Sequence, residues 1–205
     1  MDSTLIEQEC LDELADLAGI GPRVAAITEA AMRGELGFEG ALTERVALLA
    51  GQPASLLDRT LAERITLTPG AAAMARTLRA AGTRLVLVSG GFTLFTGAIA
   101  RTLGFDAHHG NALEVEGGTL TGRVRPPILG RAAKAERLAA ERTALSLRPD
   151  RAAAIGDGAN DLDMLRATPL GIAYHAKPVV AAAAPLRLDH ADLSAVPALF
   201  GLAPG

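Results

Sequence analysis

Residues 153–161 read AAIGDGAND, a short apolar run that leads directly into an aspartate between two glycines. An earlier apolar run, RLVLVSGG at 84–91, also ends in glycines, and helix-forming sequence follows each run. Strands that alternate with helices in this way predict βαβ units and a parallel sheet. Ligands bind such sheets outside the carboxyl ends of the strands, so we expect the functional groups at the ends of these two runs.

Two carboxylates follow the second run. Asp157 and Asp161 are four residues apart, which places them one turn apart if a helix begins there. Carboxylates this close repel each other unless a cation lies between them, and hard oxygen ligands suit Mg²⁺. Taken alone, the same letters also fit a turn residue at Asp157 and helix N-caps at Asn160 and Asp161.

The first run ends in Ser89, Gly90 and Gly91. A hydroxyl and two unhindered glycine amides can together cradle phosphate oxygens. In isolation, however, a serine followed by two glycines is more often a simple turn.

Lysine is rare in this chain. The sequence has 20 basic residues, and only Lys134 and Lys177 among them are lysine. In a chain that otherwise uses arginine, Lys134 is a candidate for a role that needs a compact ammonium. The alternative is that Lys134 belongs to the solvated face of the helix that leads into the second run.

Composition limits the possible functions. The 205 residues are 49% hydrophobic and 21% charged, which is typical of a globular chain with a sizeable core. A net charge of -3 with no basic run makes nucleic acid an unexpected partner. No run of 18 apolar residues indicates a membrane span, and a single cysteine, Cys10, cannot form an internal disulfide. We expect a cytoplasmic protein in a reducing compartment.

Helical periodicity dominates the first third of the chain. We predict that residues 11–68 form a helical cap inserted into an α/β core made of residues 1–10 and 69–205. Within the core, the stretch ALEVEGGTLTGRV at 112–124 predicts a β-hairpin that turns at its paired glycines.

Four sequence groups occur together: DST at 2–4, SGG at 89–91, Lys134, and GDGAND at 156–161. As a set they resemble the haloacid dehalogenase superfamily of phosphatases. The stretches MDSTLIEQECLDELA and GELGFEGALTERVALL resemble its phosphoserine phosphatase family in particular, so that the resemblance covers essentially the whole chain. It implies a Rossmann-like parallel-sheet core with an inserted helical cap, and Mg²⁺-dependent hydrolysis of O-phosphoserine through a phospho-aspartyl intermediate, the last step of serine biosynthesis.

The resemblance also implies roles for core residues. Asp2 is expected to act as general acid and base and to offer its backbone carbonyl to the metal, with Asp157 as a metal ligand and Asp161 supporting the metal's surroundings. The residues expected to contact the substrate from the core are Ser89, Gly90, Gly91, Lys134 and Asn160.

In the cap, the resemblance implies that Glu9 faces the substrate ammonium and Arg45 its carboxylate, with Met32 and Phe38 as an apolar wall. Considered without the resemblance, the two charged residues could be exposed helix charges and the two apolar residues plain core.

The opening stretch MDSTLIE fits a helix entry with Ser3 or Thr4 as N-cap. In the family's first motif, D-x-D-x-T, Asp2 is the second aspartate, and the first, the nucleophile, falls immediately before Met1. We therefore expect the chain as printed to be inactive by the covalent route, and an upstream aspartate to restore activity. The alternatives are a related enzyme for another small phosphate monoester, such as phosphohomoserine, and an inactive phosphoserine-binding module. The oligomeric state is not predicted.

Overall fold

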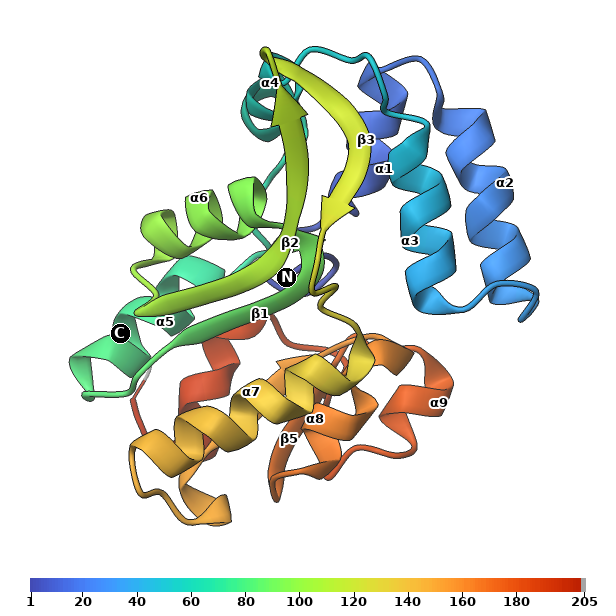
Figure 1. Cartoon of the computed structure of the whole chain (residues 1–205). Coiled ribbons are helices and arrows are strands. Elements are labelled where there is room, and N and C mark those ends of the chain that lie inside the picture. Colours follow the sequence, from blue (N-terminus) through green and yellow to red (C-terminus); the bar gives the residue numbers. More distant parts are fainter. Residues whose placement is uncertain (204–205) are drawn as a thin grey trace.

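The computed structural model describes residues 1–203, and its strands form two three-stranded sheets (Figure 1). In the first sheet, β1 (Val86–Phe92) pairs in parallel with β2 (Ala107–Glu116), and β2 pairs antiparallel with β3 (Thr119–Arg125). The predicted hairpin is thus confirmed. It turns at Gly117 and Gly118, whose positive φ angles of 57° and 77° suit a tight two-residue turn.

The second sheet is parallel throughout. It consists of β4 (Ala153–Gly156), β5 (Leu170–Tyr174) and β6 (Leu186–Leu188), with β5 in the middle. The α/β fold with parallel strands is therefore confirmed, although β6 was not expected. Its three residues are too few to show the alternation that marks a strand.

Helices cover and connect these sheets. In the core they are α5 (Ala71–Ala80), α6 (Thr93–Leu103), α7 (Arg131–Ala144), α8 (Leu162–Arg166) and α9 (Pro178–Ala181), with 3-10 helices at Pro149–Arg151, Ala159–Asp161 and Leu193–Phe200. Across residues 1–203, no helix combines the length and the apolar character that a membrane span requires.

The first third of the chain is helical, as predicted. Its helices are α1 (Cys10–Leu17), α2 (Gly21–Met32), α3 (Phe38–Ala47) and α4 (Ser55–Arg64). Gly19 and Gly34 follow α1 and α2 with φ angles of 73° and 80°, the left-handed conformation that ends helices. Figure 1 shows α1, α2 and α3 grouped beside β3. The domain boundaries at residues 11 and 68 remain a prediction.

The helix entry at Ser3 or Thr4 that the opening stretch also fits does not form, because α1 begins only at Cys10 with Glu9 as its N-cap. Residues 1–6 instead form a tight loop in which the Met1 carbonyl accepts hydrogen bonds from the amides of Thr4, Leu5 and Ile6. Ser3 has a φ of 52° in this loop. The hydroxyls that could have capped a helix bond to distant residues described below.

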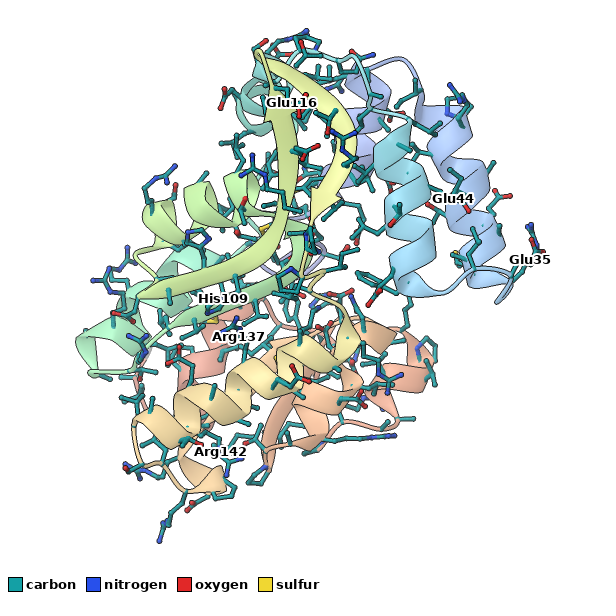
Figure 2. All side chains as sticks on the ribbon, in the orientation of Figure 1. Glu35, Glu44, His109, Glu116, Arg137 and Arg142 are labelled. Atoms are coloured by element: carbon teal, nitrogen blue, oxygen red, sulfur yellow. The ribbon has the colours of Figure 1, made fainter. Side chains whose placement is uncertain are left out.

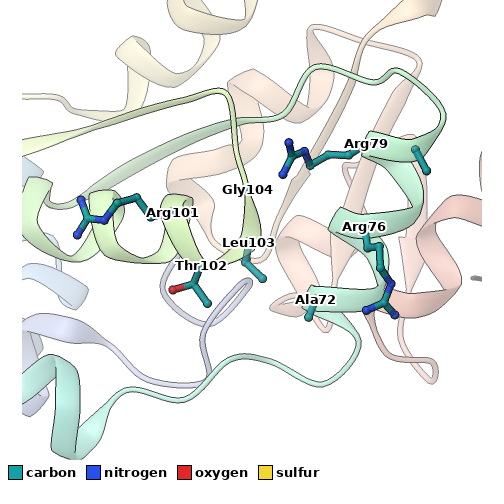
Figure 3. Close-up of a pocket in the computed structure, with 8 residues that line it drawn as sticks. Ala72, Arg76, Arg79, Arg101, Thr102, Leu103 and Gly104 are labelled. Atoms are coloured by element: carbon teal, nitrogen blue, oxygen red, sulfur yellow. The ribbon is translucent and has the colours of Figure 1, made fainter.

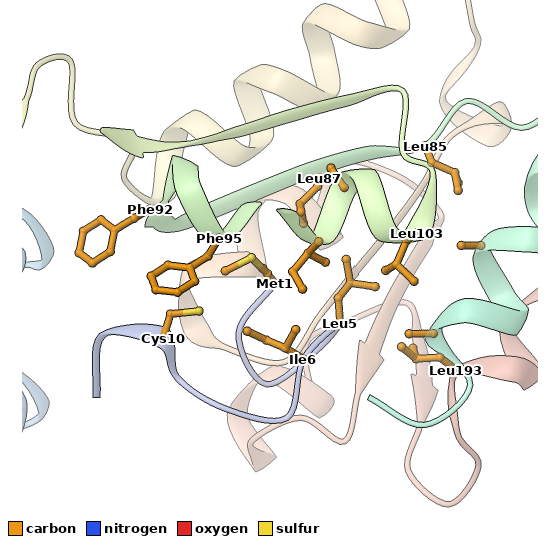
Figure 4. Close-up of a cluster of buried hydrophobic side chains, with 14 of the residues drawn as sticks. Met1, Leu5, Ile6, Cys10, Leu85, Leu87, Phe92, Phe95, Leu103 and Leu193 are labelled. Carbon is orange, nitrogen blue, oxygen red and sulfur yellow. The ribbon is translucent and has the colours of Figure 1, made fainter. Parts of the chain in front are cut away.

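This opening loop is anchored in the main hydrophobic core (Figure 4). Ile6 and Phe95 are fully buried there, and Met1 and Leu5 pack in the same cluster. A smaller cluster centred on Leu165 lies between α8 and β5. Because the side chains of the loop are part of the core, the backbone of Asp2 is held rigidly at the ends of β1 and β4.

Candidate active site

The carboxyl ends of β1 and β4 open on one cavity, which the opening loop and α3 also line. Every residue predicted for the site lines this cavity except Met32. Met32 is the last residue of α2 and is 76% exposed, so the structure does not bring it to the other site residues.

Asp2 ties the opening loop to the end of β1. Its Oδ1 accepts a hydrogen bond from the Cys10 amide at 3.0 Å, and its Oδ2 accepts one from the Ser89 hydroxyl at 3.1 Å. Ser89 Oγ in turn accepts a bond from the Gly91 amide at 3.0 Å. A Cβ on Gly91 would lie only 3.1 Å from Asp2 Oδ2, so glycine leaves room for this carboxylate. Hydrogen bonds therefore fix the conformation of the Ser89–Gly91 loop, as a phosphate-binding loop requires.

Asp157, at the end of β4, is half-buried and bonded to the opening loop. The hydroxyl of Thr4 donates to its Oδ1 at 2.6 Å, across 153 residues of sequence. Burial raises the pKa of Asp157; the Thr4 hydrogen bond opposes this, and the nearby Asp161 charge adds to it. The protein thus leaves part of this negative charge uncompensated, which is the condition that a divalent cation relieves.

Asp161 and Lys134 form a buried ion pair, with Nζ 2.6 Å from Oδ1 and both side chains less than 10% exposed. The other oxygen of Asp161 accepts hydrogen bonds from the amides of Asp157 and Gly158 at 3.2 and 3.0 Å. A Cβ on Gly156 would lie 2.5 Å from the Asp161 carboxyl carbon, so only glycine permits this approach. Lys134 is therefore not part of a solvated face, and Asp161 bonds backward to the strand end instead of capping the helix that follows it.

The oxygen donors at this end of the sheets fit a hard divalent cation better than a soft one. Asp157 offers a carboxylate and Asp2 a backbone carbonyl. Among the described residues that line the cavity there is no imidazole, and sulfur is present only in the thioether of Met1 and the buried thiol of Cys10. Within residues 1–203, no three His, Cys, Asp or Glu side chains cluster as a complete metal site. A cation here would therefore need ligands beyond these side chains.

Two charged side chains reach the cavity from the helical region. Glu9 accepts a hydrogen bond from the Ser3 hydroxyl at 2.8 Å. Its pKa is raised, mainly by partial burial and to a smaller extent by the negative charge of Asp2. Arg45 donates from Nε to the Ala41 carbonyl at 3.1 Å. Burial lowers the pKa of Arg45, while the charges of Asp12 and Glu9 oppose that effect. These side chains place one negative and one positive group opposite the strand ends.

Phe38, the first residue of α3, covers the loop at the end of β1. A Cβ on Gly90 would lie 3.0 Å from the edge of its ring, and one on Gly130 would lie 3.6 Å from it. Phe38 is only partly buried, so it is a cavity wall and not plain core.

Ser3 and Thr4 were expected at most to cap a helix. Both hydroxyls bind site carboxylates, Glu9 and Asp157 respectively. The threonine of the D-x-D-x-T motif was a usable signal for the second contact. No local sequence pattern indicated the contact between Ser3 and Glu9.

A second hollow lies between α5 and α6, lined by Arg76, Arg79 and Arg101 (Figure 3). It contains none of the predicted site residues and no carboxylate. The chemistry expected from the sequence is confined to the first cavity.

The chain belongs to the haloacid dehalogenase-like hydrolases, because the model of that family matches residues 1–166. Several curated relatives within the family are phosphoserine phosphatases. The phosphoserine phosphatase of Streptomyces coelicolor is 48% identical over 202 residues, which are 98% of this chain and 49% of that protein. That of Albidiferax ferrireducens is 44% identical over 205 residues, 98% of this chain and 86% of that protein.

Among solved structures, a phospho-aspartyl intermediate analogue of phosphoserine phosphatase superposes with a TM-score of 0.89 at 36% identity, covering 97% of this chain and 95% of that one. The resemblance inferred from the motifs is thereby confirmed. The chain nevertheless spans only about half the length of several curated relatives that it matches, including the Streptomyces protein.

Proposed function

We propose that the whole protein is a cytoplasmic phosphatase that hydrolyses O-phosphoserine to L-serine and phosphate, as the last step of serine biosynthesis. The observation that carries the proposal is the meeting of Asp2, Ser89, Lys134 and Asp157 at one cavity. These groups come from four separate segments and have the chemistry that phosphoryl transfer needs. The substrate is a small molecule.

The phosphoryl group binds where Ser89, Gly90 and Gly91 face Lys134. The Ser89 hydroxyl, which donates to Asp2 in this structure, turns to donate to the phosphoryl oxygens together with the Gly90 amide, and the ammonium of Lys134 offsets their charge. Asn160 lies at the same cavity and contributes an amide to the substrate. Because Asp161 holds Lys134 by an ion pair, the ammonium is in place before the substrate arrives.

Asp157 and the backbone carbonyl of Asp2 would hold Mg²⁺. Asp161 fixes the backbone around Asp157 because its carboxylate accepts hydrogen bonds from the amides of Asp157 and Gly158. When bound, the cation offsets the negative charge shared by the phosphate dianion and the carboxylates around it.

Asp2 moves the protons. The attacking carboxylate is that of the aspartate expected immediately before Met1, and its oxygen forms a bond to phosphorus as the bond from phosphorus to the serine oxygen breaks. Asp2 donates a proton to the departing oxygen. It then accepts one from the water that attacks the phospho-aspartyl group, so that phosphate leaves and Asp2 is protonated again.

Amino-acid recognition comes from the helical region. Glu9 faces the ammonium of the substrate and Arg45 its carboxylate, while Phe38 covers the phosphate loop. Met32 is not included, because its side chain lies away from the cavity. A substrate that lacks the amino-acid groups would use only the phosphoryl half of the site.

The test uses an extended chain, defined as this chain with an apolar strand that ends in Asp immediately before Met1. Its matched control carries Asn in place of that Asp. We expect Mg²⁺-dependent phosphate release from phosphoserine by the extended chain and not by the control. Faster release from phosphohomoserine would favour the related-enzyme alternative. No release at all, with phosphoserine binding measured by calorimetry, would overturn the proposal in favour of a binding module.

A further inference from the structure

We propose that Asn111 is a positioning residue that clamps the Ser89–Gly91 loop to the segment entering α7, and so sets the distance between the phosphate loop and Lys134. This proposal rests on the proposed function and adds to it a residue outside the cavity. Asn111 lies on β2 and is fully buried.

The side-chain amide of Asn111 joins two segments that are distant in sequence. Its Nδ2 donates to the Gly90 carbonyl at 2.8 Å and to the Leu129 carbonyl at 3.3 Å. Its Oδ1 accepts a hydrogen bond from the Leu129 amide at 2.7 Å. Both N–H groups and the carbonyl oxygen are therefore used, which is the condition under which a buried amide is tolerated.

Strand pairing does not hold the phosphate loop by itself. Val88 of β1 pairs with His109 and Phe92 pairs with Asn111, so the register shifts across residues 89–91. Gly110 opposes this bulge, and a Cβ there would lie 2.9 Å from the Gly91 carbonyl oxygen. Such a bulge leaves backbone groups without ladder partners. The bond from Asn111 to Gly90 supplies one of the missing connections.

The other side of the clamp fixes the start of α7. Leu129 precedes Gly130, the N-cap of α7, and Lys134 lies in the first turn of that helix. The Asn111 side chain accepts a hydrogen bond from the Leu129 amide and donates one to the Leu129 carbonyl, and the two bonds prevent this segment from sliding along β2. The clamp thus links the backbone of the phosphate loop to the helix that carries the ammonium.

Phe38 lies over both clamped segments, because a Cβ built on Gly90 or on Gly130 would lie 3.0 or 3.6 Å from its ring. The two backbone segments therefore also form the floor on which the substrate-covering ring sits. If they separated, the phosphate loop, Lys134 and the covering ring would all shift relative to one another. A misplacement of about 1 Å can reduce catalysis by about 10²-fold.

The test compares Asn111→Ala and Asn111→Asp with Thr168→Val in the extended chain. Thr168 is a matched control: it is 2% exposed, and its hydroxyl bonds to the backbone of Pro149, Ala152 and Leu170 at the opposite end of the second sheet. Kinetics are measured below the melting transition of every variant, with phosphoserine, with an aryl phosphate, and with inorganic phosphate as inhibitor.

We expect Asn111→Ala to lower kcat/KM by about 10- to 100-fold on both substrates alike and to weaken inhibition by inorganic phosphate. Thr168→Val should lower the melting temperature but leave kcat/KM within about twofold. In Asn111→Asp, only the protonated carboxyl can donate to a carbonyl, so activity relative to the unchanged chain should rise as the pH falls. The proposal is overturned if Asn111→Ala lowers the melting temperature and leaves kcat/KM unchanged, as the control does.

Amide hydrogen exchange on the printed chain gives an answer that does not depend on turnover. The Gly91 amide should exchange faster in Asn111→Asp, above the pH at which its carboxyl ionises, than in Thr168→Val, because the ionised side chain can no longer donate to the neighbouring Gly90 carbonyl. If Asn111→Ala does not fold, this measurement and the kinetics of Asn111→Asp decide the matter. If the extended chain fails to hydrolyse phosphoserine, the proposed function is wrong. The clamp is tested separately: equal amide exchange in Asn111→Asp and Thr168→Val would reject it.

Discussion

Lys134 Nζ lies 2.6 Å from Asp161 Oδ1 in a pair that is almost entirely shielded from water. The same carboxylate also accepts hydrogen bonds from the amides of Asp157 and Gly158. Asp161 is therefore the point at which the helix that carries the ammonium is joined to the strand end that carries the candidate metal ligand. Its removal should affect folding as well as chemistry.

Asp161→Ala should destabilise the printed chain by about 3–5 kcal/mol, because it leaves the Lys134 charge buried without its partner. Asp163→Ala is a matched control two residues away, since Asp163 pairs with Arg131 at 2.6 Å but both side chains are more than 40% exposed. The control should lose no more than about 1 kcal/mol. Urea unfolding measures both. Equal losses would mean that the buried pair adds nothing beyond a surface pair.

Lys134→Arg should lower turnover of the extended chain by about 10²-fold or more, although the charge is kept. A guanidinium is wider than an ammonium, and Lys134 is only 5% exposed, so little room is left beside Asp161 for the larger group. The control is Lys177→Arg, at the chain's other lysine, whose side chain is exposed. Phosphate release from phosphoserine measures both variants, and near-normal turnover of Lys134→Arg would remove Lys134 from the phosphate site.

The pH dependence of stability should contain a contribution from His109. Figure 2 shows His109 on β2 beside Arg137 on α7. Partial burial, followed by the Arg137 charge, lowers the pKa of His109, while Glu141 opposes this and His108 adds slightly to it. The folded protein therefore binds this proton less readily than the unfolded chain. The contribution is fully present above the ordinary pKa of about 6.5 and is lost as the pH falls through the lower folded value.

His109→Gln should accordingly flatten the stability profile below about pH 6.5. Urea unfolding of the printed chain and of the variant at a series of pH values measures the difference between the two curves. A parallel pair of curves between neutral pH and pH 5 would show that His109 titrates alike in the folded and unfolded states.

The strand ends were the most predictable part of this molecule. Gly90, Gly91 and Gly156 mark places where backbone and side chains come close, and such positions are visible as glycines after apolar runs. The joint spacing of these motifs then brought Lys134 into the site, although its own helix looked solvated. The parallel pairing of β4 with β5 follows from the same alternation of strands and helices.

Contacts between distant segments were beyond prediction. Thr4 fits an N-cap by local rules, yet its hydroxyl binds Asp157. Asn111 lies inside a hairpin strand, and the backbone groups that it bonds come from two other segments. No periodicity encodes such partners, because they exist only once the chain has folded. Met32 is the opposite case: its place in the sequence matches the family, while its side chain lies on the exposed end of α2, and its role at the site stays a prediction.

Arg45→Ala should damage hydrolysis of phosphoserine far more than hydrolysis of an aryl phosphate. The guanidinium of Arg45 is partly buried at the cavity, where the charges of Asp12 and Glu9 favour its charged form. Loss of a charge-assisted hydrogen bond to the substrate carboxylate costs about 1.5–3 kcal/mol, which corresponds to roughly 10- to 100-fold in kcat/KM. An aryl phosphate has no such carboxylate and should be hydrolysed nearly as before.

Arg33→Ala is the matched control for this change. Arg33 follows α2 in the same helical region, but it pairs with Glu35 at the surface, where both side chains are more than half exposed. The control should leave the ratio of the two substrates unchanged. Asp157→Asn should lower hydrolysis of both substrates alike, because a metal ligand serves the phosphoryl group whatever is attached to it. If Arg45→Ala also lowers both rates alike, Arg45 supports the closed cavity and does not read the substrate, and the assignment of Glu9 to the ammonium weakens with it.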